Sequence, residues 1–243
     1  KASARIADGK IGGVFDALRR NRLWDNTLII ATTDHGIAFP RMKGNLTDSG
    51  TGVFLIVKGP GGFQGGRVVD GLVSQIDIFP TLCELLSIAP PDWLDGKSLV
   101  PMVSGAQDKA HDAIFTELTY HRVYEPLRAI RAERWKYIRR FGGVYRANAN
   151  ADPRSPSTDY WTDHGWNESD PDEEMLYDLV FDPTETDNLI GNPGVAEVHK
   201  DLRQQLQRWM EETTDPLLAG PIPGPRGDFE HDRDYFTRTD QSG

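Results

Sequence analysis

The sequence has a single cysteine among its 243 residues, a shortage of positive charge, and no long hydrophobic run. The lone Cys83 cannot form an intrachain disulfide or a zinc site built from several cysteines. Because no run of about 18 apolar residues occurs, we expect no membrane partner. Twenty-seven basic residues against 37 acidic ones give a net charge of −10. This balance argues against a nucleic-acid partner, because nucleic acids bind basic surfaces.

The residues that are present suit a globular protein with a sizeable core. Apolar residues make up 38% of the sequence, and it contains six tryptophans and ten phenylalanines. A chain of this length forms one large domain, or one domain with a small second one. The negative net charge does not exclude an anionic substrate, because a local cluster of cations can override it.

The pattern of residues 1–110 is typical of the α/β class, with helices packed on a mixed sheet. Apolar residues with helical spacing predict an amphipathic helix around 11–18. The β-branched run 27–33 predicts a strand buried on both faces. Further expected elements are strands at 53–57 and 68–73 and a helix at 80–86 with proline in its first turn.

Shorter strands characterise residues 111–220, which we expect to form a small antiparallel subdomain with a closing helix. Trp135 and Tyr137 alternate with Lys136 and Ile138 in this region, as in a strand with two different faces. The expected elements are strands at 114–119, 127–133, 134–140 and 174–179, an irregular polar excursion at 146–174, and a helix at 195–210. The proline-rich end from Asp215 is predicted to be a surface arm or disordered, and 221–243 an extended tail.

A candidate metal site follows the first predicted strand. Asp34, His35 and Gly36 come directly after it, and ligands of open α/β sheets bind beyond the carboxyl ends of strands. A carboxylate and an imidazole in this position can hold a divalent cation. Ca²⁺ prefers oxygen ligands, so Asp34 suits it better than His35 does. The alternative is that Asp34 only caps a turn and that His35 is an ordinary histidine.

Several motifs occur in a recognisable order along the chain. They are 32–36 (Thr-Thr-Asp-His-Gly), Lys43 in the next loop, 74–82 (Ser-Gln-Ile-Asp-Ile-Phe-Pro-Thr-Leu), 94–102 (Leu-Asp-Gly-Lys-Ser-Leu-Val-Pro-Met), 128–138, 174–189 and 208–216. This series resembles the sulfatase family of the alkaline-phosphatase superfamily, and within it the N-sulfoglucosamine (heparan) sulfohydrolases. It departs from the pattern at Thr47, where a tyrosine is common.

The resemblance implies a role for each matching residue. Asp34 and His35 correspond to metal positions, with His35 either a weak ligand or a group that hydrogen-bonds the nucleophile. Lys43 corresponds to the lysine that contacts the sulfate, and a compact ammonium suits a sulfate oxygen. His121 and Arg128 are weaker substrate-binding candidates, since a histidine there could bind the sugar or protonate a leaving group. The alternative for both is a structural polar contact.

The resemblance also implies parts that these 243 residues lack. Related sulfatases carry a nucleophile that is oxidised to formylglycine, and an Asp-Asp pair for the metal, both in an N-terminal half. Cys83 lies in an apolar helical pattern without the arginine of that motif, so we predict a buried structural thiol. We therefore expect the chain to be inactive alone, and to need the missing N-terminal half, a divalent metal (Ca²⁺) and a sulfated sugar substrate.

Two other functions stay open from the residues alone. One is a phosphodiesterase or phosphonate hydrolase of the same superfamily, and the other is a non-catalytic carbohydrate-binding module. The remaining histidines lack a supporting motif, so we expect surface positions for His111, His164, His199 and His231. Three aromatic residues of the polar excursion are candidates for stacking on a sugar, with a solvated loop as the alternative: Tyr160, Trp161 and Trp166.

Overall fold

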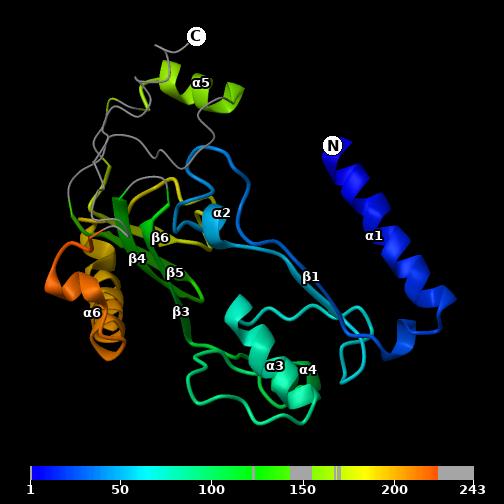
Figure 1. The fold of residues 1–243 in the computed structure, drawn as a ribbon. Coiled ribbons are helices and arrows are strands. Elements are labelled where there is room, and N and C mark those ends of the chain that lie inside the picture. The colour runs from blue at the N-terminus through cyan, green and yellow to red at the C-terminus, as the bar shows by residue number, and fades with distance from the viewer. Residues whose placement is uncertain (1, 122–123, 143–154, 167, 169–170, 224–243) are drawn as a thin grey trace. The chain divides into compact units, whose positions relative to one another are not determined.

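The structure is a computed structural model that describes residues 2–121, 124–142, 155–166, 168 and 171–223. The chain divides into two compact units (Figure 1). The first contains residues 1–33 and 54–111, and the second contains 34–53 and 112–243. In the part of the chain that is described, no helix has the length and apolar character needed to cross a membrane.

The first unit combines helices with a two-stranded sheet. Its elements are α1 (Ala2–Arg20), β1 (Ile29–Thr32), β2 (Leu55–Lys58), α3 (Ile78–Leu85), α4 (Val100–Ser104), and short 3-10 helices at Trp24–Asn26 and Gln75–Asp77. Strands β1 and β2 pair in antiparallel register, with Ile30 opposite Val57. The core beside them is formed by Phe63, Leu99, Met102 and Ala110.

Two strand predictions for this unit are wrong. β1 is only half-buried, and Ile56 of β2 is 63% exposed, because a two-stranded sheet has no inner strand that is covered on both sides. The predicted strand at 68–73 is irregular, and Val68 is 84% exposed. Gly65 and Gly66, with φ of 90° and 62°, turn the backbone just before it. A strand needs a hydrogen-bonding neighbour, and within the described residues this segment has none.

The helices of the first unit agree better with the pattern. α3 carries Pro80 in its first turn as predicted, and Cys83 is buried at 4% exposure, which confirms the prediction of a buried thiol. α1 extends beyond the predicted helix in both directions, but none of its residues is buried. Its Phe15 ring packs against Trp24 with the ring centroids 5.4 Å apart.

The prediction that His111 lies on the surface is wrong. Its Nε2 lies 2.9 Å from Oδ1 of the fully buried Asp77, and its side chain is only 12% exposed. The same carboxylate accepts hydrogen bonds from the backbone N–H groups of Ser74 and Lys97, at 2.7 and 2.8 Å. Asp77 therefore joins three segments of the first unit, and His111 is one of its structural partners.

The second unit is built on a four-stranded antiparallel sheet in the order β3-β4-β5-β6. Its elements are α2 (Asp48–Thr51), β3 (Ala113–Tyr120), β4 (Tyr124–Ala132), β5 (Trp135–Arg140), α5 (Pro156–Asp163), β6 (Glu174–Asp178), α6 (Ala196–Glu212), and 3-10 helices at Pro193–Val195 and Pro216–Ala219. The four predicted strands and the closing helix are confirmed. In the predicted excursion α5 forms a helix where we expected irregular structure, and residues 143–154 lie outside the described part.

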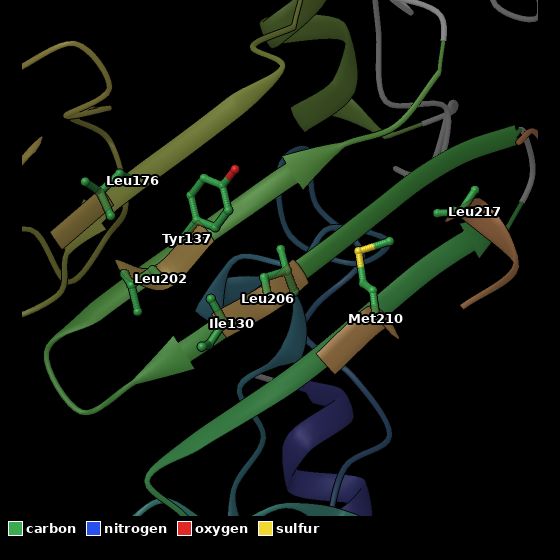
Figure 2. Packing of buried hydrophobic residues seen from close by; sticks show 7 residues of the cluster. All are labelled: Ile130, Tyr137, Leu176, Leu202, Leu206, Met210 and Leu217. Carbon is green, nitrogen blue, oxygen red and sulfur yellow. The ribbon is translucent and has the colours of Figure 1, made fainter. Parts of the chain in front are cut away.

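The two faces of this sheet are covered by different parts of the chain. Ile130, Tyr137 and Leu176 lie side by side on neighbouring strands and pack against Leu202, Leu206 and Met210 of α6 (Figure 2). On the other face, Leu46 packs with Leu127, Ala129, Ile138 and Tyr177. Since side chains alternate across a strand, both faces of β5 are buried. Lys136 is accordingly only 1% exposed, contrary to the polar face that its alternation suggested.

The segment after α6 is not the surface arm that we predicted from Asp215 onward. Asp215 is 5% exposed and Leu217 is 9% exposed, and Leu217 belongs to the core beneath α6. The Asp215 carboxylate accepts a hydrogen bond from the Leu217 N–H at 3.0 Å, which caps the 3-10 helix at Pro216–Ala219. Residues 224–243 of the predicted tail lie outside the described part.

Candidate functional site

Asp34 and His35 begin the loop 34–53, which follows β1 in the chain and belongs to the second unit. His35 Nδ1 lies 2.7 Å from the carbonyl oxygen of Gly36, which can only accept, so Nδ1 carries a hydrogen. His35 Nε2 lies 3.2 Å from Asp34 Oδ2. Nε2 and the carboxylate oxygen are both suited to bind a cation placed between them.

These two side chains suit a divalent cation but provide only part of a site. The Asp34 side chain is 85% exposed, so its oxygens are accessible. Within the described residues, no group of three or more His, Cys, Asp and Glu side chains is placed to hold a metal ion. Calcium takes six to eight oxygen ligands, so Asp34 and His35 would need further ligands.

Lys43 lies in the same loop, nine residues after Asp34. Its backbone N–H donates to the carbonyl of Ile37 at 3.1 Å, which ties the Lys43 end of the loop to the segment beside His35. Its side chain is half-buried, and the described residues provide no ion pair for its ammonium. An ammonium without a carboxylate partner is suited to an anionic ligand.

The loop closes on itself through two glycines. The Gly36 N–H donates to the Gly50 carbonyl at 2.9 Å. A Cβ atom at Gly36 would lie 1.8 Å from the Ser49 carbonyl oxygen, and one at Gly50 would lie 2.4 Å from the carbonyl oxygens of Met42 and Asn45. Only glycine permits this approach, so these two positions set the path of the backbone around Lys43.

We expect Gly36→Ala to lower the free energy of unfolding by about 3 kcal/mol, because the new methyl group overlaps a backbone oxygen that cannot rotate away. Gly12→Ala in α1 is the matched control, since no atom lies within 4 Å of its Cβ position. Alanine there should leave stability unchanged or raise it by up to about 1 kcal/mol. Urea denaturation of both variants measures the difference, and equal stabilities would contradict the close approach.

A charged cluster, with two buried and two half-buried members, fastens this loop to the four-stranded sheet. We call Asp48, Arg131, Lys136 and Glu185 the Asp48 cluster. The Asp48 carboxylate accepts from Lys136 Nζ at 2.7 Å and from Arg131 Nε at 3.3 Å. The Asp48 backbone N–H donates to Glu185 Oε2 at 2.5 Å, and the other Glu185 oxygen lies 3.6 Å from Lys136 Nζ. The loop is therefore held from β4, from β5 and from the turn after β6.

Burial and pairing act on these carboxylates in opposite directions. Burial alone would raise the pKa of Asp48, but Lys136 and Arg131 outweigh it and hold that pKa below its usual value. For Glu185 the balance is reversed, because burial and the neighbouring Asp48 charge raise its pKa in spite of Lys136. Lys136 and Glu185 are each about 1% exposed, so neither charge has water as a substitute partner.

The two weaker substrate-binding candidates lie in different surroundings. His121 follows β3 on the surface of the second unit. Arg128 is 1% exposed, and its guanidinium donates to both oxygens of Asp215, from Nε at 2.5 Å and from Nη2 at 3.1 Å. Nη1 donates to the Leu118 carbonyl at 3.1 Å. The contacts of Arg128 are those of a structural ion pair, the alternative that the sequence left open.

The Arg128–Asp215 pair predicts a pH dependence of stability. Burial would raise the pKa of Asp215, but Arg128 and the Leu217 amide outweigh it and hold that pKa below 3.8. Ionised Asp215 therefore stabilises the folded state above pH 3.8, and this contribution is lost as the pH falls through the lower folded pKa. We expect Asp215→Asn to cost about 3–5 kcal/mol near neutral pH, because it leaves Arg128 buried without an anion.

Denaturant titrations of this variant and the natural protein from about pH 2 to pH 7 check the prediction. The stability difference should shrink as the pH falls below 3.8. A difference that stays constant over this range would contradict a stabilising charge on Asp215.

Sequence reasoning missed most of the ion pairs that hold the second unit together, including those of the Asp48 cluster. Lys136, Glu185 and Asp215 were not singled out, and His199, expected on the surface, lies 2.7 Å from Glu174. The one usable signal was a lysine in the middle of an apolar strand pattern, since a buried ammonium requires an anionic partner. His231 lies outside the described residues, whereas His164 is exposed as expected.

Comparison with known proteins connects this geometry to a family. Residues 2–88 match the family model described as Sulfatase. The chain is 30% identical over 224 residues to an ulvan-active sulfatase of Formosa agariphila, covering 87% of the chain and 44% of the relative. It is 27% identical to human N-sulphoglucosamine sulphohydrolase, covering 88% and 47%. The chain thus spans about half the length of the curated relatives it matches.

Solved structures give the same grouping. A putative sulfatase from Bacteroides thetaiotaomicron superposes with a TM-score of 0.69 at 27% identity, over 91% of this chain and 44% of that one. A phosphonate monoester hydrolase of Agrobacterium radiobacter gives a TM-score of 0.63 at 28% identity, over 90% and 42%. The matches share an alkaline-phosphatase-like fold and correspond to its C-terminal part. The chain is therefore similar to the sulfatase family, by its family model over residues 2–88 and by its likeness to the C-terminal part of sulfatases over most of its length.

Proposed function

We propose that the protein containing this chain hydrolyses sulfate esters or sulfamates of sugars, with N-sulfated glucosamine as the substrate. The observation that carries this proposal is the loop 34–53, in which Asp34, His35 and Lys43 lie together on a backbone closed by Gly36 and Gly50. The similarity to a sulphohydrolase of N-sulphoglucosamine supports the sugar and the sulfamate bond.

The chemistry assigns a role to each loop residue. Water cleaves the bond to sulfur, and the products are inorganic sulfate and the free amine or alcohol of the sugar. A divalent cation, which we propose to be Ca²⁺, acts as the Lewis acid toward the sulfate oxygens when bound. Asp34 is a ligand of that cation and His35 is either a weak ligand or a hydrogen-bond partner of the nucleophile. Lys43 places its ammonium against a sulfate oxygen.

Other parts of the site come from outside the 243 residues. A formylglycine nucleophile and an Asp-Asp pair are expected in an N-terminal half, and they would complete the ligands that Asp34 and His35 begin. His121 stays our proposed contact to the sugar. Arg128 is buried and donates to Asp215 and Leu118, so we propose a structural role for it in β4 in place of a contact to the sugar.

One alternative within the fold is a phosphonate or phosphodiester hydrolase, since a phosphonate monoester hydrolase has a similar structure. Phosphoryl and sulfuryl groups are both tetrahedral anions, so fold similarity does not separate them. Lys43 favours sulfate, because it corresponds to the sulfate-contacting lysine of the sulfatases that the sequence resembles. A non-catalytic carbohydrate-binding module is the third candidate.

The test is to express the whole reading frame that contains this chain and to measure sulfate release from N-sulfoglucosamine with and without EDTA. Metal-dependent release is the expected result, with none from the 243 residues alone. Turnover of a phosphonate monoester without sulfate release would replace the proposal by its alternative. Binding of sulfated sugar in EDTA without any turnover would indicate the non-catalytic module.

A further inference from the structure

A basic cavity lies between α6 and the C-terminal end of β5 in the second unit. Its volume is about 540 Å³. It is lined by Arg139 of β5, by His199, Lys200, Arg203 and Arg208 of α6, and by two glutamines of the same helix. The residues lining it include four permanent cations and no carboxylate. This contrasts with a chain whose net charge is −10.

The spacing of these side chains along α6 places them in two adjacent rows on one face of the helix. His199, Arg203 and Gln207 follow one another at intervals of four residues, and so do Lys200, Gln204 and Arg208. Residues four apart lie on the same helix face, and eight residues rise about 12 Å. The cavity is therefore lined along more than two helical turns, which suits an extended anion better than a single small one.

One carboxylate beside the cavity contacts two of the residues that line it. Glu174 of β6 accepts from His199 Nε2 at 2.7 Å, and its other oxygen lies 3.5 Å from Arg203 Nη2. Burial would raise the pKa of Glu174, but His199, Tyr137 and Arg203 outweigh it and keep that pKa below its usual value. Glu174 thus stays ionised and positions two of the cavity's side chains. Arg139 lies directly opposite Glu174 in the pairing of β5 with β6. Among the described residues, Lys200 and Arg208 make no ion pair with Glu174, and Lys200 Nζ lies 3.9 Å from Glu197 Oε2.

The cavity lies on the opposite side of the sheet from the loop that carries Asp34. On β5, Lys136 contacts Asp48 of that loop, whereas Tyr137 packs against α6 (Figure 2). Because successive residues of a strand point to opposite faces, Arg139 shares the α6 face with Tyr137. An anion in the cavity would therefore bind apart from Asp34, His35 and Lys43.

We propose that this cavity is a second binding site for a sulfated oligosaccharide, which it would hold by residues beyond the sugar being hydrolysed. The identity of the ligand rests on the proposed function. Arginines form paired hydrogen bonds with the oxygens of sulfate groups, and the glutamines can bond hydroxyl groups. Single-stranded nucleic acid is also an extended anion, and the experiment below separates it from the sulfated oligosaccharide.

The test uses the protein expressed from the whole reading frame and a size-defined, heparin-derived octasaccharide as the probe. The variant R203Q/R208Q removes two exposed charges from the cavity, and R20Q/R22Q removes two exposed charges from the end of α1 as the control. We expect the cavity variant to bind the octasaccharide about tenfold or more weakly, with kcat/KM for the monosaccharide unchanged. The control should keep the natural affinity.

The proposal is overturned if the cavity variant binds the octasaccharide as tightly as the natural protein. Equal loss in the two variants, or equal affinity for single-stranded DNA of the same charge, would overturn it as well. The readouts of the two proposals differ. If only the cavity variant loses octasaccharide binding and the natural protein releases no sulfate, the binding site is supported and the sulfatase activity is refuted. If the natural protein releases sulfate and the cavity variant binds the octasaccharide unchanged, the sulfatase activity is supported and the binding site is refuted.

Discussion

Replacing Asp34 by alanine is expected to lower kcat/KM for sulfate release by about 100- to 1,000-fold. The charge that develops on the sulfate oxygens must be stabilised by a cation, and Asp34 is the most exposed carboxylate in the loop that would hold it. Removing one anionic ligand should also raise the metal concentration needed for half-maximal activity. Both quantities come from initial rates measured over a series of Ca²⁺ concentrations.

Asp187→Ala provides the matched control for this experiment. Asp187 is also an exposed aspartate of the second unit, and its carboxylate makes no ion pair with the described residues. The control should keep its rate within about twofold. If Asp34→Ala retained its rate and its metal dependence, Asp34 would not be a ligand, and its role would be to cap a turn.

Replacing Lys136 by methionine is expected to lower the free energy of unfolding by about 3–5 kcal/mol. Lys136 is 1% exposed and is the cation shared by Asp48 and Glu185, so its loss leaves Glu185 buried beside another carboxylate. Arg131 compensates Asp48 in part, since it remains 3.3 Å away. Guanidinium titration followed by circular dichroism measures the loss.

A double-mutant cycle separates the charge from the packing. Lys136→Met combined with Glu185→Gln should lose less stability than the sum of the single variants, because the second change removes the unpaired charge. Lys200→Met, at an exposed position of α6, should change stability by no more than about 0.5 kcal/mol. Additive effects of the pair, or a cost below about 1 kcal/mol for Lys136→Met, would show that the cluster is not a coupled unit.

The pattern of the sequence was sufficient where local periodicity decides the structure. The strands of the second unit alternate or carry β-branched and aromatic residues, and α6 repeats apolar residues at three and four residue intervals, so their bounds were close to those predicted. The motif around Asp34 likewise identified the loop. Such signals depend only on neighbours within about ten residues.

What the sequence did not reveal depends on partners far away in the chain. Nothing near Lys136 indicates that Asp48, 88 residues earlier, is its partner, and Arg128 and Asp215 are 87 residues apart. The strand prediction at 68–73 was wrong for a related reason. Apolar residues predict a strand whether or not a neighbouring strand exists to pair with it. A charged residue in a strand is therefore predicted to face solvent unless its distant partner is known.

The long separations within the Asp48 cluster also bear on when the loop acquires its shape. The contact of the Asp48 amide with Glu185 closes 137 residues of chain, and such closures are entropically costly and slow. During synthesis, Asp34, His35 and Lys43 leave the ribosome long before Glu185 is made, at about 5–20 residues per second. A nascent chain that ended before Glu185 would contain all three residues without the scaffold that fixes their loop.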